Sequence, residues 1–323
     1  MNIQVNQNSR ILIVSGGTGG HIFPAIVFGN ELKRSGHEIF YICGSRKLEL
    51  EIYNASGISP HIIDLSGSPL GSSSVLKNFG RVVDLIKGFK NTYKYIRELK
   101  PDLIILFGGY ISFIPLIIAK LKKIPAVIHE QNAAAGRVTR IAEKLGVQIL
   151  TGWPECKGIK KFNYAGIPVR EPERISRQEA LKLLGLEKFI APDQKIIGIT
   201  GGSLGSVNLR GLLIKTAALC KNYAFIFLSS GEIRNQDNMH FLKSRWDMNT
   251  FYSACDVLIC RSGGSTLAEA MKWNINTITI PWPQSAEHHQ ELNALEFSKL
   301  FSNGNIFSEN GDPENLAELI KKF

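Results

Sequence analysis

Several features that mark particular protein classes are missing from this sequence. The cysteines are scattered and form no CxxC pair, so they indicate neither a disulfide framework nor a zinc site and fit a reducing compartment; they are Cys43, Cys156, Cys220, Cys255 and Cys260. The apolar stretch 103–119 is interrupted by glycine, serine and proline and is shorter than the roughly 20 residues that span a bilayer. The first residues lack the charged start and apolar core of a secretory signal. These absences predict a soluble protein of the cytosol.

Familiar nucleotide and metal motifs are absent as well. The first glycine turn, residues 16–21 with the sequence GGTGGH, has neither GxGxxG spacing nor the lysine of a P-loop. This argues against hydride transfer and ATP hydrolysis. The chain also has no DxD pair suited to holding a metal ion. We therefore expect no metal and no cofactor.

Acidic residues are few in one half of the chain only. Residues 1–160 hold 20 Lys and Arg against 11 Asp and Glu, a net charge of +9, whereas residues 161–323 hold 18 against 17, a net charge of +1. A basic half indicates an anionic partner, such as nucleic acid, a membrane surface or a phosphorylated substrate. The alternative is an ordinary solvated basic face.

The segment 76–99 reads as one amphipathic helix. Its apolar residues recur every three or four positions and form one stripe: Phe79, Val82, Ile86, Phe89, Tyr93 and Ile96. Basic residues flank this stripe: Arg81, Lys87, Lys90, Lys94 and Arg97. Such a stripe either packs into the domain core, or its tip enters an anionic bilayer while the basic residues meet phosphates.

Short β-rich runs alternate with helix-like segments along the whole chain. The first series of runs lies at 11–15, 38–43, 61–65, 103–107, 125–129 and 147–151, with helices expected at 24–35, 76–99 and 136–145. A second series lies at 196–200, 224–229, 256–260 and 277–281. This alternation predicts an α/β fold of two Rossmann-like domains, residues 1–166 and 167–323, with parallel sheets that face a cleft.

Both halves contain glycine-rich turns directly after an apolar run. They lie at 15–20 and 108–109 in the first half and at 201–205 and 263–264 in the second. Glycines allow close approach to the backbone, and the N-terminus of a following helix favours an anion. His21, directly behind the first turn, is a candidate general base.

Seven motifs occur in an order that carries a family resemblance: GGTGGHIFPA at 16–25, GGYIS at 108–112, HEQN at 129–132, AGIPVR at 165–170, GGSLG at 201–205, RSGGSTLAE at 261–269 and HQELNA at 289–294. Together they resemble the MurG family of peptidoglycan glycosyltransferases along nearly the whole chain. The resemblance implies the GT-B fold and inverting transfer of N-acetylglucosamine from UDP-GlcNAc to the 4-hydroxyl of N-acetylmuramoyl-pentapeptide on undecaprenyl pyrophosphate. That reaction converts lipid I to lipid II for cell-wall biogenesis, cell shape and cell division.

The resemblance also implies residue roles and partners. The donor would be held by Arg170, Ser203, Gly264, Ser265, Thr266, Glu269 and Gln290, with Glu269 on the ribose and Gln290 on the sugar. The acceptor would meet Thr18, Gly19, Gly20, Tyr110 and Asn132, and the base would be His21 or Glu130. The enzyme would lie peripherally on the cytoplasmic face of the inner membrane, on an anionic surface and beside other cell-wall synthesis proteins, without binding nucleic acid.

The sequence departs from the family in length. Only 26 residues separate Ser230 from Val257, too few for a helix, a strand and a helix of usual size. The second domain is therefore expected to be shortened. Two other functions stay open from the sequence: a GT-B glycosyltransferase with a different lipid acceptor, and a decayed paralogue that binds a nucleotide sugar without turnover.

Overall fold

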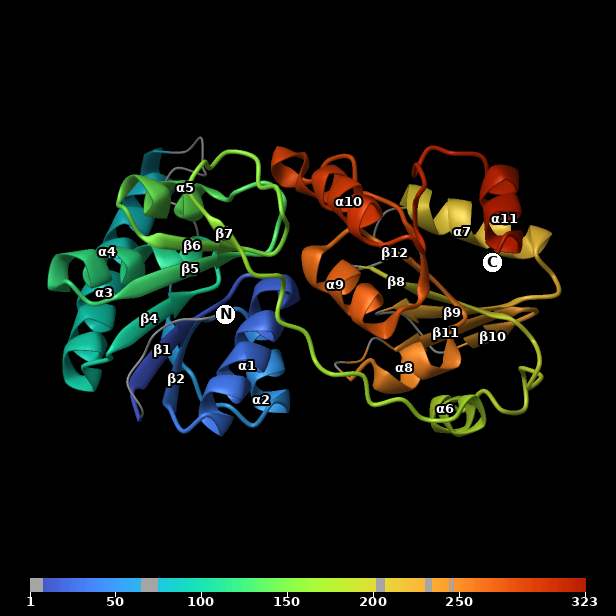
Figure 1. Cartoon of the computed structure of the whole chain (residues 1–323), viewed down its shortest axis with the longest axis horizontal. Helices are drawn as coiled ribbons and strands as arrows, with labels where there is room; N and C mark the ends of the chain where they lie inside the picture. The colour runs from blue at the N-terminus through green and yellow to red at the C-terminus, as the bar shows by residue number, and fades with distance from the viewer. Residues whose placement is uncertain (1–7, 65–74, 202–206, 230–233, 244, 246) are drawn as a thin grey trace. The chain divides into compact units, whose positions relative to one another are not determined.

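The computed structural model describes residues 8–64, 75–201, 207–229, 234–243, 245 and 247–323. The chain forms two compact units, Met1–Val169 and Arg170–Phe323. Each unit is a seven-stranded sheet with helices packed against it (Figure 1). Residues 165–176 contain no helix or strand and connect the units. The predicted boundary after residue 166 falls in this segment.

The first unit has the strand order β3-β2-β1-β4-β5-β6-β7, with every pair parallel. Its elements are β1 (Arg10–Val14), α1 (Gly19–Arg34), β2 (Glu38–Gly44), α2 (Lys47–Ala55), β3 (His61–Ile63), α3 (Val75–Leu99), β4 (Leu103–Leu106), the 3-10 turn η1 (Tyr110–Ser112), α4 (Phe113–Lys122), β5 (Ala126–Glu130), α5 (Arg137–Lys144), β6 (Gln148–Thr151) and β7 (Asn163–Tyr164). The six predicted strands are all present. Helix α1 begins at Gly19, before the predicted start at residue 24. Pro24 therefore lies inside the helix and not in its first turn.

Both faces of this sheet are buried, which explains its continuous apolar strands. Along β1, Leu12 and Val14 pack into the cluster under α3, α4 and α5, whereas Ile11 and Ile13 pack into the cluster under α1 and α2. Side chains of a strand alternate between faces, so a strand covered on both sides needs apolar residues at every position.

The second unit repeats this plan with one strand reversed. Its order is β10-β11-β9-β8-β12-β13-β14, and only β10 pairs antiparallel. Its elements are α6 (Arg177–Leu184), β8 (Ile196–Thr200), α7 (Val207–Leu219), β9 (Ala224–Ser229), β10 (Arg234–Gln236), β11 (Met239–Lys243), α8 (Asn249–Ala254), β12 (Val257–Cys260), α9 (Gly264–Trp273), β13 (Asn276–Thr279), the 3-10 turn η2 (Ala286–His288), α10 (His289–Leu300), β14 (Gly304–Ile306) and α11 (Pro313–Lys321).

The short stretch before β12 is accommodated by a hairpin. Strand β11 lies parallel to β9, and the described chain between them contains the three-residue strand β10, which pairs antiparallel with β11. One six-residue helix, α8, then leads to β12. A reversed strand needs fewer residues than a crossover helix, so the sheet keeps its parallel order despite the missing length.

Helix α3 packs into the core along its described part. Ile96 is buried and Phe89 and Tyr93 pack against the cluster, whereas Ile86 is 52% exposed. The core interpretation of the stripe is therefore confirmed for Phe89, Tyr93 and Ile96, and wrong for Ile86. The side chains of Phe79, Arg81 and Val82 lie outside the described residues. In the part of the chain that is described, no helix is long and apolar enough to cross a membrane.

Candidate active site

In the first unit, the predicted acceptor-side residues gather at the carboxyl ends of the central strands. The glycine turn 15–18 follows β1, Gly108 and Gly109 follow β4, and residues 131–132 follow β5. Strands β1 and β4 are neighbours from which the chain winds in opposite directions. Ligands of open α/β sheets bind at such a switch point. The fold therefore places these motifs where a ligand site is expected.

His21 stands between the two glycine turns. Its Nδ1 lies 3.2 Å from the Thr18 hydroxyl. A Cβ on Gly17 or on Gly109 would be 4.0 Å from that same nitrogen, and one on Gly108 would be 3.7 Å from His21 Nε2. These three glycines have φ values of +92°, +72° and +73°, a region that disfavours side chains. At these three positions the turns therefore bring only backbone close to the imidazole.

The predicted residues beside His21 belong to the first turn of α1. Thr18 is its N-cap residue, followed by Gly19 and Gly20. A Cβ on Gly19 would approach the Phe23 ring to 3.1 Å, which is tight for any larger residue. Together these residues present the amino end of α1, a position that favours an anionic group.

Both carboxylate oxygens of Glu130 accept hydrogen bonds from neighbouring residues of the chain. Its Oε1 accepts hydrogen bonds from the Asn132 backbone and side-chain nitrogens, both at 3.2 Å. Its Oε2 accepts from the Gly136 N–H at 2.9 Å and from the Thr139 hydroxyl at 2.6 Å. The side chain is buried, and it fixes Asn132 and the start of α5. Of the two candidate bases, this geometry favours His21.

Tyr110 opens η1 directly after the second glycine turn. The Arg46 guanidinium lies 5.0 Å from the centre of its ring, and burial is the main cause that raises the pKa of its hydroxyl, with a further rise from Glu49. Arg46 comes from the loop before α2 and was not predicted from the sequence. Arg46 therefore adds positive potential beside Tyr110, one of the residues predicted for the acceptor.

In the second unit, the N-terminus of α9 contains the turn that is predicted to hold the donor diphosphate. Gly264, Ser265 and Thr266 form its first turn, the part of a helix whose backbone N–H groups favour an anion. The turn before them is held from behind, because Asn293 Nδ2 donates to the Ser262 carbonyl at 2.9 Å. Ser203, predicted to contact the same diphosphate, lies outside the described residues.

Arg261, the first residue of that motif, has a structural role. Its guanidinium donates to the Glu309 carboxylate at 2.9 and 3.3 Å and to the carbonyls of Ile280 and Pro281 at 3.1 and 3.2 Å. Both charged side chains are buried. A bidentate pair of this kind is geometrically specific, and it fixes the end of β12 to the segment after β14, while the two carbonyl bonds fix it to the segment after β13.

Glu269 lies on α9, beyond that first turn, among three other side chains of the second unit. Tyr252 donates its hydroxyl proton to Glu269 Oε2 at 2.8 Å, and Tyr252 in turn packs on Trp273 with ring centres 5.4 Å apart. Burial raises the pKa of Glu269, while the Tyr252 hydrogen bond and the charge of Arg170 oppose that rise. The structure thus brings together Arg170 and Glu269, both predicted for the donor. The sequence analysis missed Tyr252.

Gln290 lies in the first turn of α10 and organises the preceding loop. Its Oε1 accepts a hydrogen bond from the Trp282 N–H at 2.9 Å, and its own N–H donates to the Ser285 hydroxyl at 3.2 Å. The bond from Trp282 orients the side-chain amide, and its nitrogen is the end left for the predicted contact with the sugar. Among the described residues, no cluster of three or more His, Cys, Asp or Glu side chains could hold a metal ion.

We expect Gly201→Ala to destabilise the second unit by about 1–3 kcal/mol, since it strains the backbone and overpacks the turn. Gly201 has φ of +135°, and a Cβ there would come within 2.6 Å of the Arg261 backbone nitrogen. Gly211→Ala on α7 is the control, because its Cβ would meet nothing within 4 Å. Urea unfolding of both variants measures the difference. Equal stability of the two variants would contradict the expected strain.

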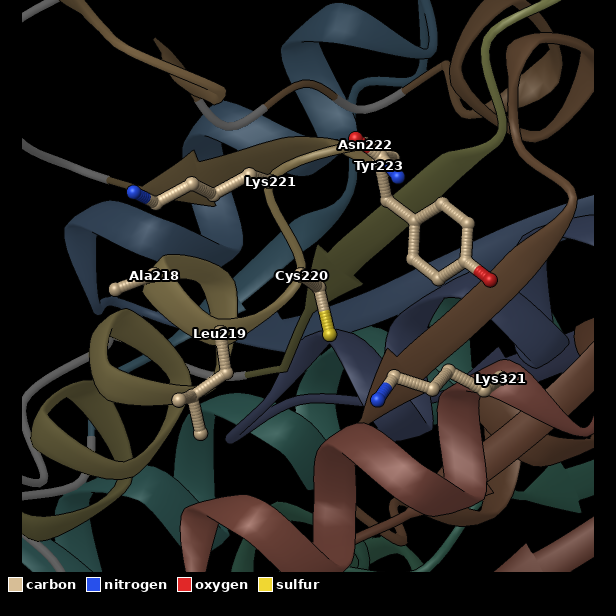
Figure 2. A pocket seen from close by; sticks show the side chains of 7 residues that line it. All are labelled: Ala218, Leu219, Cys220, Lys221, Asn222, Tyr223 and Lys321. Atoms are coloured by element: carbon tan, nitrogen blue, oxygen red, sulfur yellow. The ribbon is translucent and has the colours of Figure 1, made fainter.

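A pocket of about 530 Å³ lies away from these turns (Figure 2). It is formed where α7 ends and β9 begins, at the amino ends of the strands, opposite to their carboxyl ends. Figure 2 shows Cys220 and Lys321 among its lining side chains; the full set is Ala218, Leu219, Cys220, Lys221, Asn222, Tyr223 and Lys321. None of these residues belongs to the predicted site.

The two halves of the chain match the two domains of one enzyme family. Residues 11–151 match the Glycosyltransferase family 28 N-terminal domain, and residues 196–323 match the Glycosyltransferase family 28 C-terminal domain. A protein of Protochlamydia amoebophila is 31% identical over 334 residues, covering 97% of this chain and 87% of that protein. One from Halothermothrix orenii is 32% identical over 317 residues, covering 90% and 83%. Both are named UDP-N-acetylglucosamine--N-acetylmuramyl-(pentapeptide) pyrophosphoryl-undecaprenol N-acetylglucosamine transferase.

Solved structures agree on the fold. The crystal structure of Acinetobacter baumannii MurG superposes with a TM-score of 0.71 at 22% identity, covering 97% of this chain and 90% of that chain. The glycosyltransferase of kitacinnamycin superposes with a TM-score of 0.68 at 13% identity, covering 98% and 91%. The two Rossmann-like domains predicted from the sequence are thereby confirmed, and their fold is that of the GT-B glycosyltransferases.

Proposed function

Since the chain belongs to glycosyltransferase family 28, we propose that it transfers N-acetylglucosamine from UDP-GlcNAc to lipid I and so forms lipid II. It is a hexosyltransferase. The observation that carries this proposal is the match to relatives named for this reaction over more than four fifths of their length, at 30% identity and above. Formation of lipid II is the step through which the chain would act in cell-wall growth, cell shape and division.

The site chemistry supports an inverting displacement. His21 Nε2 takes the proton of the acceptor hydroxyl, whose oxygen forms the new bond to the anomeric carbon. The bond from that carbon to the diphosphate breaks on the opposite side, and UDP leaves with the electron pair. The N-terminus of α9 offers N–H groups and a positive dipole end to that leaving group. Arg170 adds a positive charge beside Glu269.

Competition among substrates tests this function. The purified chain is offered UDP-GlcNAc, UDP-GalNAc and UDP-glucose together, with lipid I and a glycerolipid acceptor, and products are identified by mass. We expect addition of one N-acetylhexosamine from UDP-GlcNAc to lipid I. Transfer to the glycerolipid alone would favour a different lipid acceptor, and donor binding without any product would favour the decayed paralogue.

The first unit also carries a surface suited to an anionic membrane. On α3, Lys87, Lys90, Lys94 and Arg97 are exposed, and α4, which packs on α3, ends in exposed Lys120, Lys122 and Lys123. Two apolar side chains lie among them in the open, Ile86 at 52% and Leu121 at 66% exposure. Basic residues around exposed apolar ones are the pattern of peripheral membrane binding. This supports a membrane surface as partner, with the cytoplasmic leaflet as the location.

We expect binding to vesicles with anionic lipid that weakens as salt rises, because such attraction is screened beyond about 10 Å at 0.1 M ionic strength. Replacing Leu121 by Ser should weaken binding further. Leu183→Ser is the matched control, since Leu183 is 59% exposed on α6 of the other unit. Co-sedimentation measures both effects. Equal binding to neutral and anionic vesicles would contradict the electrostatic contribution.

A further inference from the structure

A buried amide oxygen beside His21 has no hydrogen-bond partner. Gln131 is 2% exposed, and its Oε1 is the side-chain atom left unsatisfied. Leaving a buried acceptor unpaired costs about 1–3 kcal/mol, and most buried polar groups are paired. Some other contact must therefore hold the amide in this orientation, and the unpaired oxygen is a candidate for a functional interaction.

That contact is with His129, which is fully buried. Its Nε2 lies 2.7 Å from the Gly166 carbonyl and so must carry the proton. Burial lowers the pKa of His129 to about 4, so the ring is neutral and its Nδ1 is an acceptor. Gln131 Nε2 donates to that Nδ1 at 3.0 Å and to the His129 carbonyl at 3.1 Å. A flipped amide would place its oxygen against two acceptors.

With the nitrogen end held by His129, the oxygen end faces the turn that covers His21. A Cβ on Gly108 would lie 3.8 Å from Gln131 Oε1 and 3.7 Å from His21 Nε2. Gln131 Oε1 and His21 Nε2 therefore border the same small space next to Gly108, and the lack of a side chain on Gly108 keeps that space open. On its other side, the imidazole meets Thr18 through Nδ1 at 3.2 Å.

We infer that Gln131 is a positioning residue whose fixed carbonyl dipole stabilises the positively charged form of His21. This rests on the proposed function, in which His21 Nε2 receives the proton of the acceptor hydroxyl as the sugar is transferred. The negative end of a buried dipole acts more strongly than it would in water, and it needs no reorganisation when the charge develops. Hydrogen bonds connect Gly166 to His129 and His129 to Gln131, and the Gln131 oxygen and His21 Nε2 both lie next to Gly108.

Titratable and charged groups face this region from several elements: His129 and Glu130 on β5, Tyr110 on η1 with Arg46 over its ring, and Glu49 and Tyr53 on α2 behind the first glycine turn. Substituting Gln131 leaves all of these groups in place. A change in the pKa of His21 then reports on the amide itself.

The test is an NMR titration of the His21 imidazole in the full chain without substrate. In Gln131→Met, which keeps the side-chain length and removes the dipole, we expect the pKa of His21 to fall by roughly 0.5–1 unit. The acid limb of the kcat/KM profile should move to lower pH in parallel, because the neutral base then persists further into acid. Gln148→Met, at an exposed position on β6, is the control and should leave the pKa of His21 unchanged.

A second variant covers the case in which Gln131→Met does not fold. His129→Phe keeps an aromatic ring that can stack on Phe107, but it removes the acceptor that holds the Gln131 amide. The pKa of His21 should therefore fall in this variant as well. An unchanged pKa of His21 in a folded variant overturns the inference. Because the titration needs no substrate, its result is independent of whether the chain forms lipid II.

Discussion

Replacing His21 by Ala is expected to lower kcat by about 10²–10⁴, the usual contribution of a general base, while the affinity for UDP stays unchanged. His21 belongs to the first unit, where its imidazole lies between two glycine turns. The residues proposed for the donor belong to the second. Steady-state kinetics with lipid I and calorimetry with UDP measure the two effects separately.

The kinetic pattern identifies the role of His21. A base acts in the transition state, so its loss lowers kcat, whereas loss of a contact made equally in both states raises the acceptor KM. His37→Ala is the control, because His37 lies in the loop between α1 and β2, at the amino ends of the strands and not at the carboxyl ends where His21 lies. Wild-type kcat and acceptor KM in His21→Ala would exclude both roles.

Replacing Glu269 by Ala is expected to weaken UDP binding by roughly 10- to 150-fold, the effect of losing a charge-assisted hydrogen bond of about 1.5–3 kcal/mol. Glu269 already accepts one bond from Tyr252 at 2.8 Å, which orients the carboxylate that we propose for the ribose hydroxyls. Tyr252→Phe should weaken binding less, because the carboxylate remains. Calorimetric titration of UDP into each variant measures these changes.

Acid should weaken the donor site at a higher pH than an ordinary carboxyl group would dictate. Burial raises the pKa of Glu269, and only its ionised form accepts two hydrogen bonds from vicinal hydroxyls. UDP affinity should therefore fall as the pH drops through this raised pKa. Glu318→Ala, on an exposed face of α11, is the control for Glu269→Ala. If Glu269→Ala binds UDP as the wild type does, Glu269 is not part of the donor site.

The strands could be predicted from sequence because burial on both faces leaves an unmistakable pattern. Leu103–Leu106 is apolar throughout, Ile196–Thr200 is apolar up to its last residue, and a glycine follows each strand within two residues. The hairpin of β10 and β11 could not be predicted. Strand β10 is the exposed polar tripeptide Arg234–Gln236, whose extended conformation comes from pairing with β11 rather than from its own side chains.

Motif order proposes residues for the site, but it says nothing of how their side chains contact one another. Motif order indicated both His21 and Glu130 as bases. Only the contacts of Glu130 with Asn132, Gly136 and Thr139 show that its carboxylate holds the start of α5. Likewise, Tyr252 and Glu269 are 17 positions apart, and no local pattern links them. Such side-chain pairs depend on the folded backbone, which periodicity does not describe.

Transfer of radiolabelled N-acetylglucosamine from UDP-GlcNAc to lipid I by the purified full chain tests the proposed function most directly. We expect label in a lipid-linked disaccharide, with a β linkage that a β-N-acetylglucosaminidase cleaves, since displacement from the α-linked donor inverts the anomeric carbon. His21→Ala run beside it should give little label. Absence of labelled lipid from a chain that still binds UDP, or an α-linked product, would contradict the proposed function and its inverting mechanism.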